Sequence, residues 1–308
     1  MNSTELAIII PAYKATFLEQ TLCSIAMQTN HSFHVYVGDD ASPDSLEDIC
    51  SKFTNKITLS YHRFNSNLGS NDLVAHWERC INLSKNEPYI WLFSDDDIMP
   101  NDAVAQIENC IKTTGSLFMR LPLCIINENN EICHSNPPFY KSISNYKELL
   151  IDKLGGRTST AAIEYIFHRS IYQKNEGFIH FPLAWCSDDA TWTKFAYLSG
   201  KITNIGGSPV KWRNVDGINI SNSKNYNQKL EATHLFLIWL QNNFPNLRKE
   251  KSFRKALYHY LHTIIKVSLN KEIPIYKLAY LCITYAEIDK IRAVKLWLNY
   301  FYRVKWFN

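Results

Sequence analysis

Trp91-Leu92-Phe93-Ser94-Asp95-Asp96-Asp97 joins a short apolar run to three adjacent carboxylates. The apolar run is typical of a buried strand, whereas neighbouring carboxylates repel each other and are costly to bury unless a partner compensates their charge. A divalent cation is such a partner, because hard cations take oxygen ligands. The carboxyl end of a strand in an α/β sheet is also where ligands bind. The stretch therefore predicts a metal and phosphate site, with an acidic surface turn as the alternative.

Strands and helices alternate around this stretch, from residue 6 to about residue 112. Apolar runs predict strands over residues 6–10, 33–37, 57–62 and 89–93. Helical spacing of apolar residues predicts helices over residues 16–28, 45–53, 71–84 and 102–112. We expect Ser45 and Asp48 to form a capping box at the start of the second helix. Short links between alternating elements indicate an α/β fold with a mostly parallel central sheet.

The alternation loosens after residue 112. We expect residues 117–126 to form one strand, with Pro122 at an edge or a bulge. Residues 134–160 are rich in Ser, Asn, Pro and Gly, and we interpret them as a long functional loop or lid. Later strands are expected over 161–167, 202–205 and 208–212, and a helix over 190–198. Because the chain is mostly helical from about residue 226, we predict a domain over residues 1–222 and a helical extension over 223–308.

The charge of the chain is unevenly distributed. The net charge of the 308 residues is +4, but residues 251–308 hold eleven Lys and Arg against three acidic residues and carry +8. Residues 1–250 therefore carry −4. A basic segment beside an acidic body indicates an anionic partner for that segment.

The eight cysteines include no C-x-x-C pair, so the sequence offers no support for a zinc site. Most of them lie among apolar residues, where buried free thiols are expected. The amino terminus has no basic region, and the chain has no apolar run of 18 residues. We therefore expect neither a signal peptide nor a transmembrane helix, and we predict a cytoplasmic protein with reduced thiols.

Two further acidic pairs, Asp39-Asp40 and Asp188-Asp189, each follow an apolar run or open a predicted helix. Sugar transfer from a nucleotide diphosphate needs a group that holds the nucleobase. It also needs a cation that neutralises the departing diphosphate and a base that deprotonates the acceptor hydroxyl. Three acidic clusters match these needs, so the sequence favours sugar-transfer chemistry over an ordinary acidic surface.

The motifs, in this order, resemble the family 2 glycosyltransferases, which have the GT-A fold. Ala7-Ile8-Ile9-Ile10-Pro11-Ala12-Tyr13 resembles the opening strand of that family, and Val37 to Asp44 resembles its D-D-x-S-x-D element. Asn67-Leu68-Gly69 is similar to its N-x-G turn, Tyr89 to Asp97 to its D-x-D region, and Pro182 to Trp192 to its later acidic motif. The resemblance covers roughly residues 5–220.

The resemblance implies a nucleotide site and a metal. The residues implied in nucleotide binding are Pro11, Ala12, Tyr13, Asp39, Asp40, Asn67, Gly69, Asp95 and Arg213. Among them, Asp40 would accept a hydrogen bond from the uracil imide, with Asp39 supporting its loop. Asp96 and Asp97 would bind Mn²⁺ or Mg²⁺. Ser94 departs from the pattern, because it lies where many relatives have the first Asp of D-x-D and is a poor metal ligand.

The resemblance also implies how the acceptor is activated. Asp189, or Asp188, would be the general base of an inverting, single-displacement transfer. Trp185 and Trp192 would stack on a sugar ring, with packing in the core as the alternative. For Arg213, the alternative to binding a phosphate oxygen is a surface Arg packed on Trp212.

The predicted function is transfer from a UDP-sugar to a hydroxyl of a lipid-linked bacterial surface glycan such as a capsule, an O-antigen or an exopolysaccharide. The alternatives are a dTDP- or GDP-sugar donor, or a binding module without activity, of which Ser94 would be the sign. Residues 297–307 mix Trp and Tyr with cations, which suits an interfacial helix on the anionic inner face of the cytoplasmic membrane. The alternatives for this tail are helices that pack on the catalytic domain or that form a homodimer interface. No motif indicates nucleic-acid binding.

Overall fold

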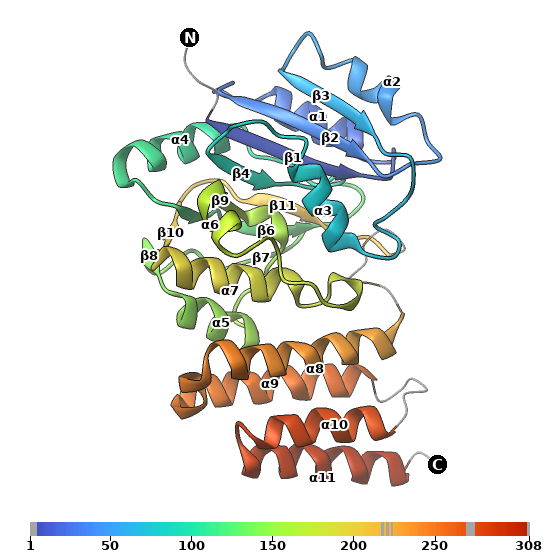
Figure 1. Ribbon diagram of the computed structural model, residues 1–308, viewed down its shortest axis with the longest axis vertical. Coiled ribbons are helices and arrows are strands. Elements are labelled where there is room, and N and C mark those ends of the chain that lie inside the picture. Colours follow the sequence, from blue (N-terminus) through green and yellow to red (C-terminus); the bar gives the residue numbers. More distant parts are fainter. Residues whose placement is uncertain (1–4, 217–218, 220–221, 223, 269–274, 307–308) are drawn as a thin grey trace. The chain divides into compact units, whose positions relative to one another are not determined.

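The computed structural model describes residues 5–216, 219, 222, 224–268 and 275–306, with residues 267, 268 and 301–306 as backbone only (Figure 1). Contacts within the chain divide it into two compact units. The first contains residues 1–146, 160–178 and 194–218, and the second contains residues 147–159, 179–193 and 219–308. The unit with the C-terminal helices thus also contains two earlier segments of the chain. The boundary between a catalytic domain and a helical extension at residue 222 stays a prediction.

The first unit is built on a mostly parallel sheet of eight strands in the order β3-β2-β1-β4-β9-β5-β10-β8. These strands are β1 Leu6–Ala12, β2 Phe33–Asp39, β3 Leu59–Arg63, β4 Tyr89–Leu92, β5 Phe118–Arg120, β8 Ile143–Ser144, β9 Tyr165–His168 and β10 Ile202–Asn204. Strands β1 to β4 are mutually parallel, as expected from the sequence. Strand β9 lies between β4 and β5 and is antiparallel to both. The α/β fold class predicted from the sequence is confirmed.

Both faces of the central strands are covered by helices, which explains why these strands are apolar without a break. The helices are α1 Leu18–Ala26, α2 Leu46–Ser51, α3 Leu73–Ile81, α4 Ala103–Thr114 and α6 Arg169–Lys174, with a short 3₁₀ turn at Ala162–Glu164. In β1, Ile8 and Ile10 join a core to which α1, α2 and α4 contribute. Ile9 points to the opposite face and is equally buried, and α3 packs against β1, β2 and β4.

Pro122 divides the single strand that the sequence predicted over residues 117–126, so that prediction is wrong. The residues before it form β5 in the main sheet, and those after it form β6 Leu123–Ile126 in a second sheet. The second sheet has the order β11-β6-β7, with β7 Ile132–Ser135 and β11 Val210–Arg213. Proline has no N–H to donate to a ladder, so a strand that continued through it would lose a hydrogen bond.

Two other local expectations are corrected. Ser45 precedes α2, but its side chain makes no capping hydrogen bond, so the predicted capping box is absent there. The segment 134–160, expected to be irregular, contains β8 and the helix α5 Tyr146–Leu154. Leu149, Leu150 and Leu154 of α5 are buried, so packing stabilises a helix that composition alone did not indicate.

The second unit is mainly helical. It contains most of α5, a 3₁₀ turn at Pro182–Ala184, the start of α7 Ser187–Ser199, α8 Tyr226–Asn243, a 3₁₀ turn at Pro245–Lys249, α9 Lys251–Ser268, α10 Ile275–Ala286 and α11 Lys290–Trp306. Helix α10 packs against α8 and α11, and α11 packs against α9. Within the described part of the chain, no helix is long and apolar enough to cross a membrane. All eight cysteines are free thiols and six are buried, as predicted.

Candidate active site

The loop after β4 fixes the loop after β1. The backbone N–H groups of Tyr13 and Lys14 both donate to Oδ2 of Asp95, at 2.8 and 3.0 Å. These two loops follow neighbouring parallel strands, and the carboxyl ends of such strands lie at one edge of a sheet. Asp95 therefore holds the backbone that follows Pro11 and Ala12 in a defined position at this edge.

The loop after β2 binds the same segment from the other side. Ser42 donates its hydroxyl to the carbonyl oxygen of Tyr13 at 2.5 Å, and Asp44 accepts from the N–H of Ala15 at 3.1 Å. The side chain of Tyr13 stays exposed. The three loops after β1, β2 and β4 are thus joined by side chains into a preformed edge with an accessible aromatic ring.

Asp39 anchors the loop after β2 to β3. Its side chain is fully buried, and Oδ1 accepts from the N–H of Ser42 at 2.7 Å. Oδ2 accepts from the hydroxyl of Tyr61 at 2.5 Å and from Nη1 of Arg63 at 2.7 Å. The carboxylate is therefore compensated entirely within the protein.

Asp40 organises the turn at Asn67-Leu68-Gly69. Its two oxygens accept from the N–H groups of Leu68 and Gly69, each at 2.8 Å, and Arg79 also donates to Oδ1. A Cβ on Gly69 would lie 2.7 Å from Oδ2 of Asp40, so this close approach requires glycine. The uracil N–H that is predicted to bind Asp40 would donate to a carboxylate oxygen that already accepts a hydrogen bond from this turn.

His76 lies 3.5 Å from Oδ1 of Asp40. Burial lowers the pKa of His76 to about 4, and the attraction of Asp40 does not offset that effect. His76 is therefore neutral at pH 7, and Arg79 is the cation that compensates Asp40. Neither residue was singled out in the sequence, because both lie on α3 without a local motif.

The acidic triplet after β4 divides into three environments. Asp95 binds the backbone as described above. Asp96, 8% exposed, accepts a hydrogen bond from the hydroxyl of Ser94 at Oδ1, at 2.5 Å. Among the residues the structure describes, Ser94 is the one other residue that donates a hydrogen bond to this carboxylate. Asp97 is buried and its Oδ1 accepts from the N–H of Arg213 at 2.6 Å.

Burial raises the pKa of each of the three carboxyls, in the case of Asp95 to about 6. Asp96 raises the pKa of Asp95 and of Asp97 further by repulsion, and the nearby cations Lys14 and Arg213 offset these effects only in part. A hard cation would add the positive charge that is still missing, and the carboxylate oxygens of Asp96 have the chemistry to hold it together with phosphate oxygens and water. The described residues contain no ready-made group of three or more His, Cys, Asp or Glu side chains around a cation position.

Arg213 is completely buried behind the triplet. Its Nε donates to the carbonyl oxygen of Asp96 at 2.7 Å, and its guanidinium lies over the ring of Phe17. Its Nη groups donate to the carbonyls of Asn127 and Glu128 and to the side chains of Gln20 and Asn130. All five N–H groups of the guanidinium therefore have acceptors within the protein.

The acidic pair Asp188-Asp189 lies in the second unit and has a basic partner. Nζ of Lys153 lies 3.2 Å from Oδ1 of Asp189. Burial, reinforced by repulsion from Asp189, raises the pKa of Asp188 to about 7. One carboxyl of the pair contacts a cation, and the other has a pKa raised to about 7. Such a pair is suited to proton transfer near neutral pH. Lys153 was missed in the sequence because the segment that holds α5 was interpreted as a loop.

The backbone just before this pair is strained. Leu183, Ala184 and Cys186 have φ angles of 58°, 53° and 65°, which non-glycine residues rarely adopt. Ala41, directly after Asp39-Asp40, has a φ of 55°. Strained residues cluster at functional sites, so their position beside two of the acidic clusters supports a functional role for both.

The two tryptophans near the pair differ in accessibility. Trp185 is partly exposed, donates Nε1 to the hydroxyl of Thr233 at 3.2 Å, and has Nζ of Lys229 4.6 Å from its ring centroid. Trp192 is 1% exposed. A sugar ring could contact Trp185 as it stands, whereas contact with Trp192 would require the ring to become accessible.

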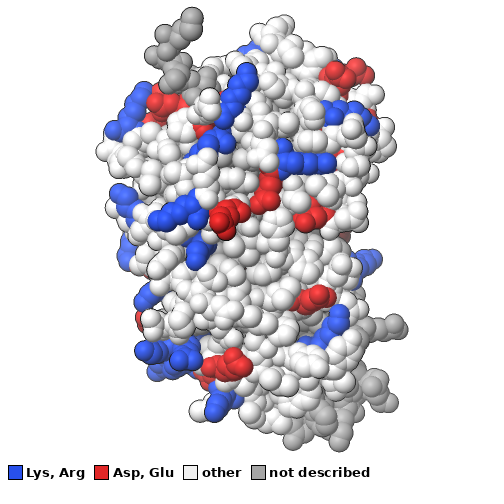
Figure 2. Space-filling view, viewed as in Figure 1, with Lys and Arg blue, Asp and Glu red and all other residues white. Residues whose placement is uncertain are grey.

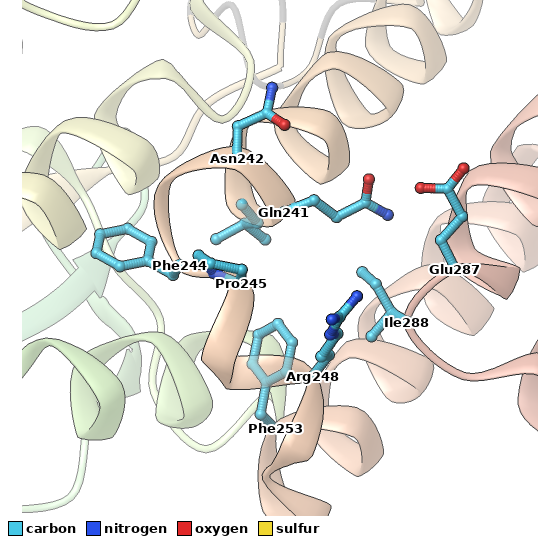
Figure 3. A pocket seen from close by; sticks show the side chains of 9 residues that line it. Gln241, Asn242, Phe244, Pro245, Arg248, Phe253, Glu287 and Ile288 are labelled. Atoms are coloured by element: carbon cyan, nitrogen blue, oxygen red, sulfur yellow. The ribbon is translucent and has the colours of Figure 1, made fainter.

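A cavity of about 150 Å³ lies in the second unit, between α8, the 3₁₀ turn after it, and the end of α10 (Figure 3). Figure 3 shows Gln241, Arg248 and Glu287 around it. None of the residues that the sequence singled out lines this cavity.

On the face seen in Figure 2, Lys and Arg side chains are interspersed with Asp and Glu. The acidic clusters, rather than this cavity, carry the chemistry described above.

The sequence and the fold of the chain are similar to those of known proteins. Residues 7–174 match the sequence model of the family described as glycosyl transferase family 2. The structure is similar to that of residues 1–349 of TarS from S. aureus in complex with UDP-GlcNAc, with 17% identity, a TM-score of 0.70, and coverage of 94% of this chain and 81% of that one. The same TarS fragment with UDP gives 16% identity, a TM-score of 0.69, and coverage of 95% and 83%.

A more distant structural similarity is to the mannosyltransferase PcManGT from Pyrobaculum calidifontis in complex with GDP-Man and Mn²⁺. The identity is 14% and the TM-score is 0.52, with coverage of 96% of this chain and 84% of that one. No curated protein matches the sequence. These structures share the GT-A fold that the sequence predicted. Because the family match spans more than half of the chain and includes the loops after β1, β2 and β4, the protein belongs to glycosyl transferase family 2.

Proposed function

We propose that the protein transfers a sugar from a UDP-sugar to a hydroxyl group of a growing, lipid-linked bacterial surface glycan, with inversion at the anomeric carbon. The observation that carries this proposal is the preformed edge at β1, β2 and β4. Buried carboxylates there fix the loops, and the carboxylate oxygens of Asp96 have the chemistry to hold a cation. The structural similarity to TarS with UDP-GlcNAc favours UDP, and the GDP-Man complex of PcManGT keeps GDP as the alternative.

In the proposed reaction, Asp96 would hold Mn²⁺ or Mg²⁺, with Asp97 beside it, and the cation would neutralise charge on the departing diphosphate. Tyr13 and the loop it belongs to would contact the base and ribose. Asp189, or Asp188, would accept the proton of the acceptor hydroxyl as the oxygen attacks the sugar.

We infer a different role for Arg213 than the phosphate contact predicted from the sequence. Because its five N–H groups are directed at protein acceptors and its side chain is fully buried, a diphosphate oxygen would have to displace one of them. Arg213 instead fixes the backbone of Asp96 and thereby orients the carboxylate that would bind the metal. This role supports the site without contacting the donor.

Binding of UDP should stabilise the protein, and Mn²⁺ should increase that effect. At a ligand concentration 100 times the Kd, the expected stabilisation is about 2.7 kcal/mol. We expect thermal-shift titrations to give a larger rise in Tm with UDP than with dTDP or GDP. Asp96→Asn should remove the Mn²⁺-dependent part, whereas Asp48→Asn, a matched change of an exposed acid on α2, should not.

The outcomes of these titrations separate the alternatives. A larger shift with GDP or dTDP would replace UDP as the donor nucleotide. A shift without sugar transfer to any acceptor, in product analysis with a panel of nucleotide sugars, would identify a binding module. No shift with any nucleotide would contradict the proposed enzyme.

We also propose that the outer face of α10 and α11 contacts an anionic membrane, which would bring the enzyme to a lipid-linked acceptor. Exposed apolar residues recur at helical spacing on both helices, at Tyr276, Tyr280 and Ile283 on α10 and at Ile291, Val294 and Leu298 on α11. These residues lie opposite the buried faces of the helices. Lys290 and Lys295 are exposed on α11, a combination that suits an anionic interface.

Vesicle sedimentation tests this contact. We expect the full chain to sediment with vesicles of phosphatidylcholine and phosphatidylglycerol, and not with phosphatidylcholine alone. The double variant Ile291→Glu/Val294→Glu should stay in the supernatant, while Ile132→Glu, on β7 and as exposed as Val294 at 58%, should still sediment. If the double variant instead converts a dimer to a monomer in light scattering and leaves sedimentation unchanged, the face is a dimer interface.

A further inference from the structure

We propose that Lys153 is a positioning residue for the general base, and that it holds the carboxylate of Asp189 in place and in its charged form. The inference rests on the proposed function, because it assigns a partner to the base of that reaction. It concerns a residue outside every motif in the sequence. Lys153 lies near the end of α5, and Asp189 lies in the first turn of α7.

The geometry of the pair supports this role. Nζ of Lys153 lies 3.2 Å from Oδ1 of Asp189, and the two side chains are 24% and 13% exposed. Ion pairs that are partly removed from water are screened less than surface pairs, so the charge of Lys153 acts strongly on its neighbours. Both residues belong to the second unit, so the pair is formed within one compact body.

Titratable groups beside the ion pair of Lys153 and Asp189 also act on its charge. They are Asp188, Cys186 and Tyr260. Burial raises the pKa of the Cys186 thiol and of the Tyr260 hydroxyl, so both are neutral at pH 7. Burial lowers the pKa of Lys153, but Asp189 and Asp188 outweigh that effect and raise it, so Lys153 stays charged.

Two adjacent carboxyls and one cation produce an asymmetric pair. Asp189 is the carboxyl in contact with Lys153. Asp188 is the carboxyl whose pKa burial and repulsion from Asp189 raise to about 7. Two neighbouring carboxyls do not both ionise freely, because their negative charges repel each other. A cation in contact with one of them favours that one as the base. We therefore assign the role of base to Asp189, the carboxyl that Lys153 contacts.

The same helix offers a matched control. Lys147, also on α5, has its Nζ 2.9 Å from Oε1 of Glu250, but the side chains of that pair are 42% and 44% exposed. Exposed pairs of this kind contribute little to stability or to neighbouring pKa values. Lys147→Met thus removes one lysine and one ion pair from α5 without touching the acidic pair.

The pH profile of sugar transfer tests the proposal. Without the cation, the pair should protonate at higher pH, since an opposite charge favours the ionised form. In Lys153→Met we expect the acidic limb of the kcat profile to move up by about one pH unit. At pH values below the limb, kcat should fall roughly tenfold, and at pH values above the limb it should partly recover. Lys153→Arg should restore the wild-type limb, and Lys147→Met should leave it unchanged.

Carboxyl ¹³C NMR titration of Asp188 and Asp189 gives a second readout that needs no substrate. If the wild-type protein transfers sugar but Lys153→Met lowers activity equally at every pH, Lys153 is only structural and the inference fails while the proposed function stands. If no donor supports transfer, the proposed function fails, and unshifted carboxyl titrations in Lys153→Met would overturn the pairing itself. Should Lys153→Met not fold, Lys153→Gln is titrated in its place.

Discussion

Asp189→Asn is expected to lower kcat of sugar transfer by about 10²–10⁴-fold, because general-base catalysis contributes on that order. Asparagine keeps the shape of the side chain but cannot accept the proton of the acceptor hydroxyl. Nucleotide binding should be unchanged, because the loops fixed by Asp95 and Asp40 lie in the first unit. The measurement is kcat for transfer, together with the rise in Tm that UDP produces.

Asp188→Asn is the matched comparison, since it removes the adjacent carboxyl and leaves the contact between Lys153 and Asp189. We expect a smaller loss of kcat in this variant than in Asp189→Asn. Full activity of Asp189→Asn together with an inactive Asp188→Asn would assign the base to Asp188. Full activity of both variants would exclude this pair as the source of the base.

Arg213→Met is expected to destabilise the first unit by about 3–5 kcal/mol, the usual cost of removing one partner from a buried ionic contact. The change removes the donor to the backbone of Asp96 and leaves several carbonyl acceptors unpaired. It also takes away the cation that lowers the pKa of Asp96 and of Asp97. Urea unfolding, followed by a probe in the first unit, measures the free energy.

Lys52→Met is the control for this variant, because Lys52 pairs with Glu19 on the surface of the same unit. Exposed pairs contribute about 0–1 kcal/mol, so we expect a small change. If Arg213→Met were as stable as the wild type but bound UDP much more weakly, Arg213 would act on the diphosphate and not as a clamp.

The sequence predicted the parts of the fold that depend on local pattern. The apolar run at the start of the chain indicated a strand buried on both faces, and Ile8, Ile9 and Ile10 are indeed fully buried in β1. The regular alternation up to residue 112 gave four parallel strands and their helices. The acidic clusters were visible because each is a set of adjacent residues at the end of an element.

Other features depend on pairing between distant segments, which local pattern does not show. Strand β9 runs antiparallel between β4 and β5, and Pro122 separates strands of two different sheets. Helix α5 lies in a segment whose composition indicated a loop, and its stability comes from the burial of its leucines. Tertiary packing overrode composition there.

The site shows the same division. By itself, the sequence determined which carboxylates follow the strands and which family the chain resembles, because residue type and spacing are local properties. Only the tertiary structure decided how each carboxylate is used. Asp95 binds the backbone of Tyr13, and Asp40 holds a turn 28 residues away. Such roles depend on which donors the fold brings within hydrogen-bonding distance of a buried charge, and no spacing along the chain specifies them.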